Sequence, residues 1–192
     1  LQQDLRAFSA CKIGLIPTLE VLHAVIDMLR QLPAGTPVVL DPVIAASSGA
    51  ALMQDDVRQQ LVEHLWPLVT VCTPNRAEAR LLASASGAGT IERLLGRTPG
   101  WTLMKGADES VAPEVVHHLY RDGTCYATYV WPRLDGHFHG SGCTLASAVA
   151  ANLACGASVA SAVGAGLDYT WRALIEPLDI GGAQYLPRRF LR

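Results

Sequence analysis

Residues 37–42, Pro37-Val38-Val39-Leu40-Asp41-Pro42, are a short apolar run that ends in a carboxylate and a proline. Such a run is typical of a buried strand. Similar short apolar runs, each followed by a polar residue, a glycine or a proline, recur at residues 10–13 before Gly14, at residues 69–73 before Pro74 and Asn75, and at residues 101–104 before Lys105. Helical patterns separate these runs, at residues 19–29, at residues 57–65 and around residues 79–82. The alternation predicts βαβ units with a parallel sheet, whose ligands bind at the carboxyl ends of the strands.

The second half of the chain has a different pattern. Residues 114–120 and 125–131 flank the turn Arg121-Asp122-Gly123-Thr124, which predicts an antiparallel hairpin at the edge of the parallel sheet. Beyond the hairpin, a glycine-rich turn opens an Ala-rich helix at residues 144–154, and a further helix is expected at residues 159–175.

Two stretches carry no periodic signal. We expect a loop at residues 47–51, and we expect residues 83–100, rich in Ser, Gly and Ala, to be partly mobile. The sequence contains neither an internal repeat nor an interdomain linker. Residues 1–192 are therefore predicted to form a single α/β domain.

The charge balance argues against nucleic-acid binding. The 192 residues include 15 Lys and Arg against 17 Asp and Glu, so the basic surplus that phosphate-backbone binding uses is missing. Apolar stretches are interrupted well before the ~18 residues that a membrane span needs, and residues 1–6 lack the pattern of a signal peptide. Five widely spaced cysteines without a C-x-x-C motif predict free thiols, and hence a cytoplasmic protein.

The segment His139-Gly140-Ser141-Gly142-Cys143-Thr144 is a glycine-rich turn that leads into a helix. Free N–H groups and the positive end of the helix dipole make such a turn suited to a phosphate. It is not a Walker A motif, and Leu145 stands where a dinucleotide fingerprint has its third glycine. The alternative is that the glycines serve only close packing of the small-residue helix.

Cys143 lies in the first turn of that helix, where the dipole favours a thiolate that could act as a base or a nucleophile. A lone cysteine is more often a small buried residue. Both interpretations remain open from the residues alone.

Four polar residues at strand ends also have two interpretations. Asp41 is costly beside an apolar strand unless it is paired or functional, but it could instead cap a turn. Asn75 and Glu78 could lie near a metal–phosphate group or merely start a helix, and Lys105 could face phosphate or solvent. Five histidines show no metal-ligand spacing and are expected at the surface or in loops: His23, His64, His117, His118 and His137.

In this order, five motifs resemble those of the hydroxymethylpyrimidine/phosphomethylpyrimidine kinases, the thiamine-biosynthesis branch of the ribokinase-like superfamily. They are Lys12-Ile13-Gly14, Val39-Leu40-Asp41-Pro42-Val43, Thr73-Pro74-Asn75-Arg76-Ala77-Glu78-Ala79, Leu103-Met104-Lys105-Gly106 and His139-Gly140-Ser141-Gly142-Cys143-Thr144-Leu145. The resemblance runs from about Lys12 to Gly156. The last motif is the most specific, because most of the superfamily has Asp where Cys143 stands.

The resemblance implies a three-layer α/β/α fold and ATP-dependent phosphorylation of 4-amino-5-hydroxymethyl-2-methylpyrimidine and then of its monophosphate, with Mg²⁺. It places Cys143 near the substrate hydroxyl. The remaining roles that it implies are an anion hole from Gly140, Ser141 and Gly142, a Mg²⁺–phosphate group around Asp41, Asn75 and Glu78, a nucleotide contact from Lys105, and a pyrimidine pocket from Gly14, Leu15 and Val43. Asp41 and Glu78 would hold the metal through water, and a homodimer is compatible with the superfamily.

Two departures from the family pattern stand out. Members carry an N-terminal βαβ portion before the position of Lys12, which this sequence lacks, and the stretch between Asn75 and Lys105 is short. The alternatives are a pyridoxal-type vitamin kinase, which Cys143 disfavours, and a catalytically inactive ligand-binding or regulatory domain of the same fold. A nucleotide-cofactor oxidoreductase is disfavoured because no strand precedes a dinucleotide fingerprint.

Overall fold

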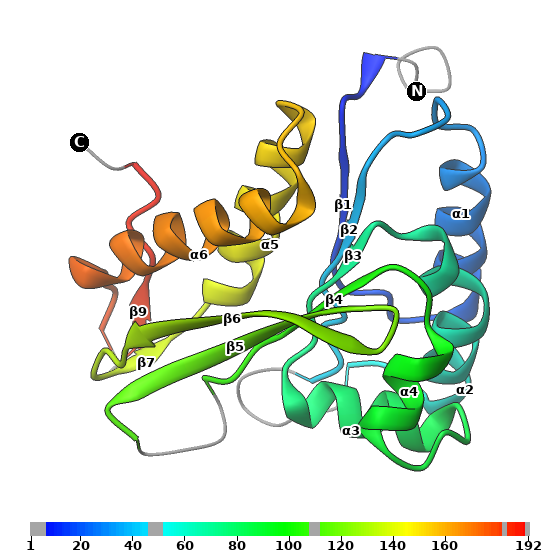
Figure 1. Cartoon of the computed structure of the whole chain (residues 1–192), viewed down its shortest axis with the longest axis horizontal. Helices are drawn as coiled ribbons and strands as arrows, with labels where there is room; N and C mark the ends of the chain where they lie inside the picture. The colour runs from blue at the N-terminus through cyan, green and yellow to red at the C-terminus, as the bar shows by residue number, and fades with distance from the viewer. Residues whose placement is uncertain (1–6, 46–51, 108–111, 182–183, 191–192) are drawn as a thin grey trace.

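The computed structural model describes residues 7–45, 52–107, 112–181 and 184–190, and its centre is a six-stranded sheet (Figure 1). The strands lie side by side in chain order: β1 (Cys11–Ile13), β2 (Val38–Leu40), β3 (Val71–Cys72), β4 (Trp101–Met104), β5 (Glu114–Arg121) and β6 (Thr124–Pro132). Strands β1 to β4 pair in parallel, and β5 is antiparallel to both of its neighbours. The mostly parallel sheet with an antiparallel edge hairpin is confirmed.

Helices cover both faces of this sheet, so the predicted three layers are also confirmed (Figure 1). One face carries α1 (Leu19–Leu29), α2 (Asp55–Gln60), α3 (Arg76–Ala85) and α4 (Ile91–Arg97), and the other carries α5 (Ser141–Ala154) and α6 (Val159–Ile175). Strand β2 shows how one sequence serves both layers, because successive side chains of a strand point to opposite faces. Val38 and Leu40 pack into the core with α1, whereas Val39 packs into the core with α5 and α6.

The β5–β6 hairpin closes through a two-residue turn. Asp122 and Gly123 have positive φ angles of 47° and 80°, as the type I′ turn that fits the twist of a hairpin requires. A register shift between Leu119 and Tyr120 places Tyr126 outside the regular pairing. The hairpin lies at the end of the sheet away from β1.

Residues 83–100 are more regular than the sequence indicated. Helix α3 extends to Ala85, and α4 begins after Thr90, whose hydroxyl accepts a hydrogen bond from the Arg93 N–H. Leu94 and Leu95 of α4 are buried. The capping threonine and the apolar pair specify a short helix in spite of the local Ser, Gly and Ala content.

The predicted helix at residues 57–65 is divided. Helix α2 ends at Gln60, a π-helical turn η2 (Leu61–Leu65) follows, and a 3₁₀ turn η3 (Trp66–Leu68) completes the segment. Pro67, which has no N–H to donate, stands in that last turn. The loop expected at residues 47–51 lies outside the described residues.

A second, three-stranded sheet is absent from the sequence-based prediction. It consists of β7 (His137–Phe138), β9 (Gln184–Leu186) and β8 (Leu178–Asp179), with β9 in the middle. Strands of two or three residues are too short to give a periodic signal. Because β9 pairs with β7, this sheet holds the segment after α6 beside the start of α5.

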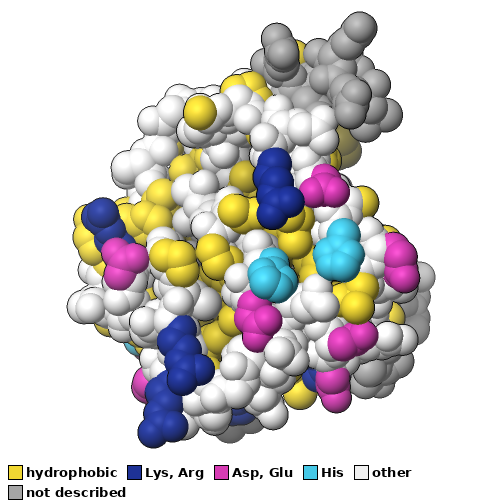
Figure 2. All heavy atoms as spheres, turned by 90° about the vertical axis from the view of Figure 1, so that its right-hand side faces the viewer, with side chains coloured by type: hydrophobic (Ala, Val, Ile, Leu, Met, Phe, Trp, Pro, Cys, Tyr) yellow, Lys and Arg dark blue, Asp and Glu magenta, His cyan; other side chains and the backbone are white. Residues whose placement is uncertain are grey.

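The helical face around α1 carries a mixed surface. Figure 2 shows acidic, basic and hydrophobic side chains interspersed on this face, without one continuous basic region. No helix within the described parts of the chain combines the length and apolarity that crossing a membrane requires.

Candidate active site

Charged side chains from three strand ends meet at the carboxyl edge of the parallel sheet. Asp41 follows β2 and is only 1% exposed, and its Oδ1 lies 2.9 Å from Nζ of Lys105, which follows β4. The same Nζ lies 3.7 Å from Oε2 of Glu78. The Thr73 hydroxyl, after β3, donates to Asp41 Oδ1 at 3.3 Å. The structure thus brings together Asp41, Glu78 and Lys105, which the sequence placed at one edge.

Lys105 remains a cation in this cluster. Burial acts to lower its pKa, but the carboxylates of Asp41 and Glu78 outweigh burial, and the net pKa is raised. Below the cluster, Cys72 is completely buried, and burial followed by the Asp41 charge raises the pKa of its thiol well above the usual value. The cluster therefore holds one ammonium between two carboxylates, with a neutral thiol beneath it.

Asn75 has a clear structural role. Its Oδ1 accepts from the Glu78 N–H at 2.7 Å, and Glu78 Oε2 accepts from the Asn75 N–H at 2.7 Å, which is a capping box at the start of α3. The Lys105 N–H also donates to the Pro74 carbonyl at 2.9 Å. The cap fixes the Glu78 carboxylate so that it faces Lys105.

The glycine-rich turn lies directly on this cluster. Gly140 is the N-cap of α5 with a φ of 81°, and in the described part of the chain α5 has no side-chain cap hydrogen bond. The N–H groups at such a helix start can therefore serve other partners. A Cβ added to Gly142 would lie 3.2 Å from Lys105 Nζ and 3.7 Å from Asp41 Oδ2. A glycine therefore lets the helix start approach the charged cluster without displacing Lys105.

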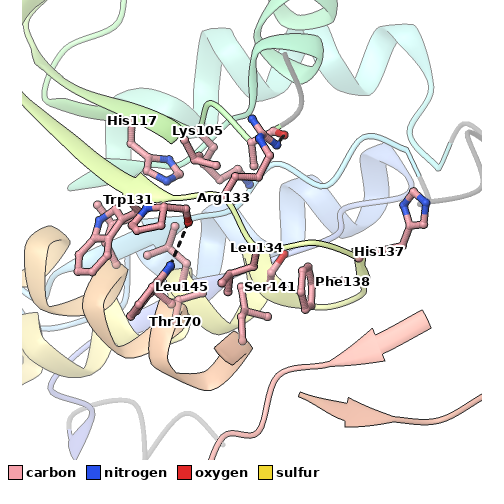
Figure 3. Close-up of a pocket in the computed structure, with 18 of the residues that line it drawn as sticks. Lys105, His117, Trp131, Arg133, Leu134, His137, Phe138, Ser141, Leu145 and Thr170 are labelled. Carbon is pink, nitrogen blue, oxygen red and sulfur yellow. Dashed lines mark hydrogen bonds between the residues drawn. The ribbon is translucent and has the colours of Figure 1, made fainter. Parts of the chain in front are cut away.

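A cavity of about 400 Å³ opens beside Lys105 (Figure 3). At one end Lys105, Ser141 and Gly142 line it. The apolar side chains that line it are Ala107, Val115, Trp131, Pro132, Leu134, Phe138, Leu145, Leu167, Trp171 and Leu174. Trp171 is fixed by its indole N–H, which donates to the Pro132 carbonyl at 3.0 Å, the dashed line in Figure 3. The cavity thus combines a polar end with an aromatic and aliphatic wall.

Cys143 lies apart from this cavity. It is exposed in the first turn of α5 and lines a second cavity of about 520 Å³ together with Ser147, Tyr169 and Arg189. The Arg189 guanidinium donates from Nε to the Thr144 hydroxyl at 3.2 Å, so the segment after β9 reaches the start of α5. Cys143 is accessible to a ligand, unlike the buried Cys72.

The residues expected to line a pyrimidine pocket lie near Asp41 without lining either cavity. The Asp41 N–H donates to the Ile13 carbonyl at 2.9 Å, one residue before Gly14, and the Val43 N–H donates to the Asp41 carbonyl at 2.8 Å. Leu15 is 44% exposed. Gly14, Leu15 and Val43 therefore belong to the same edge of the sheet as the charged cluster, toward β1.

His117 does not lie at the surface or in a loop, as the sequence analysis expected. It stands in β5, is 9% exposed, and lines the cavity beside Lys105. The spacing Val115, His117 and Leu119 could have indicated an inward-facing side chain, because alternate strand residues share a face. Trp171 was also missed, since it stands in no motif, and Thr73 was given no role although it opens the third motif.

The Asp41 and Glu78 carboxylates suit a hard divalent cation, since Mg²⁺ in nucleotide sites is usually held by one or two carboxylates, waters and substrate phosphates. Both carboxylates contact the Nζ atom of Lys105, and Lys105 lines the cavity. No group of three or more His, Cys, Asp or Glu side chains in the described residues forms a metal-binding cluster by itself. The donor set therefore fits a metal that arrives with phosphates.

Comparison with known proteins assigns this architecture. The phosphomethylpyrimidine kinase family model matches residues 3–188. Hydroxymethylpyrimidine/phosphomethylpyrimidine kinases from Haemophilus influenzae and Streptomyces coelicolor are 32% and 36% identical, each over 90% of this chain. The chain spans 67% and 65% of their respective lengths.

Solved structures give the same picture. Bacillus subtilis pyridoxal kinase in an ADP complex matches 94% of this chain and 70% of its own, with a TM-score of 0.79 and 25% identity. Phosphomethylpyrimidine kinase from Clostridium difficile matches 90% of this chain and 74% of its own, with a TM-score of 0.68 and 25% identity. Since the family model covers nearly the whole sequence and the curated relatives carry the same name, this chain belongs to the phosphomethylpyrimidine kinase family.

Proposed function

We propose that this chain transfers the γ-phosphoryl group of ATP to the hydroxymethyl group of 4-amino-5-hydroxymethyl-2-methylpyrimidine, and then a second phosphoryl group to the resulting monophosphate. The observation that carries the proposal is the position of Gly142 over the Lys105–Asp41 pair, 3.2 Å from Nζ to the position of an added Cβ. Free helix N–H groups and a fixed ammonium then converge on one point. Family membership supplies the pyrimidine alcohol as substrate.

The cavity beside Lys105 is the proposed nucleotide site. Its apolar wall, with Trp131 and Trp171 ring centroids 5.5 Å apart, suits a base, and its polar end suits phosphates. Related pyridoxal kinases were crystallised with ADP and with AMP-PCP. Those complexes support a nucleotide as a ligand of this fold.

Phosphoryl transfer requires positioning and charge stabilisation more than covalent chemistry. The N–H groups of Gly140, Ser141 and Gly142 would donate to the oxygens of the transferring group, and Lys105 would offset its negative charge. Cys143, accessible in the same turn, would lie beside the acceptor hydroxyl and receive or relay its proton. Gly14, Leu15 and Val43 would form the wall of the pyrimidine site.

Asp41 and Glu78 are the side chains that would hold Mg²⁺, through water, at the nucleotide phosphates. When bound, the metal supplies further positive charge to the phosphate oxygens. Lys105 keeps the two carboxylates in place near the cavity, at 2.9 and 3.7 Å. Asn75 contributes indirectly, because its cap fixes Glu78.

The proposal is tested by measuring ADP release with Mg-ATP and either hydroxymethylpyrimidine, its monophosphate or pyridoxal as acceptor. We expect release with both pyrimidines, and kcat/KM for the pyrimidine alcohol at least tenfold above that for pyridoxal. Absence of acceptor-dependent ADP release would contradict the kinase proposal and favour an inactive binding domain.

A pyridoxal kinase is the second candidate, because pyridoxal kinases are among the structures with the highest TM-scores reported above. The similarity covers 94% of this chain and concerns the fold. Cys143 and the family match favour the pyrimidine. A higher kcat/KM for pyridoxal in the same assay would reverse this order.

A further inference from the structure

His117 is held in one tautomer by the backbone of the site. Its Nδ1 accepts a hydrogen bond from the Gly106 N–H at 3.4 Å, next to Lys105 in the chain. A ring nitrogen that accepts carries no proton, so the neutral imidazole has its proton on Nε2. The side chain is therefore oriented as a donor on its far side.

That donor faces the cavity. His117 lines the cavity with Lys105, and Figure 3 shows its ring pointing from β5 toward the interior of the site. The residue is 9% exposed, and the hydrogen bond that the ring makes with the described residues is the one at Nδ1. A donor that faces the cavity can pair with an acceptor atom of a bound ligand.

The imidazole is neutral at physiological pH. Burial, and then the positive charge of Lys105 and the neighbouring His118, lower the pKa of His117 to about 4. It therefore offers a hydrogen bond to a ligand without adding a second cation beside Lys105.

We propose that the Nε2–H of His117 donates a hydrogen bond to a phosphate oxygen of the nucleotide bound beside Lys105. The proposal rests on the proposed function, which puts a nucleotide in this cavity. A phosphate is the partner, rather than the base, because the His117 ring is held by the N–H of Gly106, the residue after Lys105, and Lys105 is the proposed phosphate contact. The other polar groups of that end, an ammonium and helix N–H groups, are donors too.

The test is the affinity for ADP and for adenosine, measured by isothermal titration calorimetry on the whole chain. His117→Asn keeps an acceptor for the Gly106 N–H and removes the Nε2 donor. We expect it to weaken ADP binding about tenfold and to change adenosine binding less than twofold, because a lost hydrogen bond to a charged group costs roughly that factor. His117→Gln, whose amide reaches farther, should recover part of the ADP affinity.

His118→Asn is the matched control. His118 is the next residue on β5, and its ring pairs with the Thr128 hydroxyl on the opposite face, so both affinities should match wild type. Equal ADP affinity of His117→Asn and wild type would overturn the phosphate contact alone, and so would parallel losses for ADP and adenosine. A wild-type chain that binds neither compound would overturn the nucleotide site itself, and the contact with it.

Discussion

The Lys105 ammonium balances the negative charges of two carboxylates, at an edge of the sheet that is largely shielded from water. Asp41 is 1% exposed, and its Oδ1 accepts from both Lys105 and the Thr73 hydroxyl. Removing the ammonium while leaving the carboxylate buried creates an uncompensated charge. The stability of the fold and the chemistry of the site therefore depend on the same side chain.

Lys105→Met should lower the free energy of unfolding by about 3 kcal/mol and abolish phosphoryl transfer. Urea denaturation and the ADP-release assay measure the two effects. Adding Asp41→Asn should restore much of the stability, since the buried charge is then removed, without restoring activity. If Lys105→Met unfolded like wild type, the ion pair would not be stabilising as described.

The burial of His117 makes the free energy of unfolding depend on pH in the acid range. Its pKa falls from 6.5 in the unfolded chain to about 4 in the folded one, so the unfolded state binds more protons between these values. The contribution of this group to the free energy of unfolding is therefore fully present above pH 6.5. It falls by about 3 kcal/mol as the pH is lowered toward 4. Urea midpoints between pH 4 and 7 should show a smaller decline for His117→Asn than for wild type, and identical declines would contradict this assignment.

Gly142→Ala tests the close approach of the glycine turn to the charged cluster. The new methyl would meet Lys105 Nζ at 3.2 Å, so Lys105 or the helix start must move by a few tenths of an ångström. We expect kcat to fall at least tenfold with a melting temperature within a few degrees of wild type, because catalytic geometry tolerates little displacement. Gly96→Ala is the control: a Cβ there meets nothing within 4 Å, and α4 should gain stability without change in kcat.

At the scale of elements, α3 connects a strand end to the site through its cap. Asn75→Ala should cost about 1 kcal/mol and release Glu78, whereas Asn75→Asp keeps an N-cap acceptor and should preserve the melting temperature. If Asn75 also lies near the nucleotide phosphates, Asn75→Asp should raise the KM for ATP by charge repulsion. An unchanged KM would leave Asn75 with its capping role alone.

The strands and long helices could be predicted because their signals are local. The run Val38 to Leu40 ends at Asp41, and α1 repeats Leu22, Ile26 and Leu29 at helical spacing. Helix α4 and the β7–β9–β8 sheet escaped prediction, since seven residues or fewer carry little periodicity and β7 pairs with a strand from the far end of the chain. Tertiary contacts, rather than local propensity, specify those elements.

The site was predictable as far as its strand-end residues are concerned. Asp41, Glu78 and Lys105 meet because parallel strands end at one edge, which the alternation already indicated. The inward orientation of His117 and the fixed indole of Trp171 depend on packing between β5, β6 and α6. No sequence motif predicts side-chain orientations that depend on packing between separate elements.

At the scale of the molecule, helices of both layers meet the sheet at the edge that carries the charged cluster. The α3 layer supplies Glu78, and the α5 layer supplies the glycine turn, with the sheet end carrying Asp41 and Lys105 between them. The segment after α6 returns through β9 to place Arg189 against Thr144. The residues of the proposed nucleotide site thus all come from this chain, which spans about two thirds of the length of its relatives.

The most direct test of the account is transfer of the γ-³²P label of ATP to hydroxymethylpyrimidine, with the labelled product identified by mass. The account predicts label in the pyrimidine monophosphate with wild type and with His118→Asn, and none with Lys105→Met. Label released only as inorganic phosphate, or label in the pyrimidine with Lys105→Met at the wild-type rate, would contradict it.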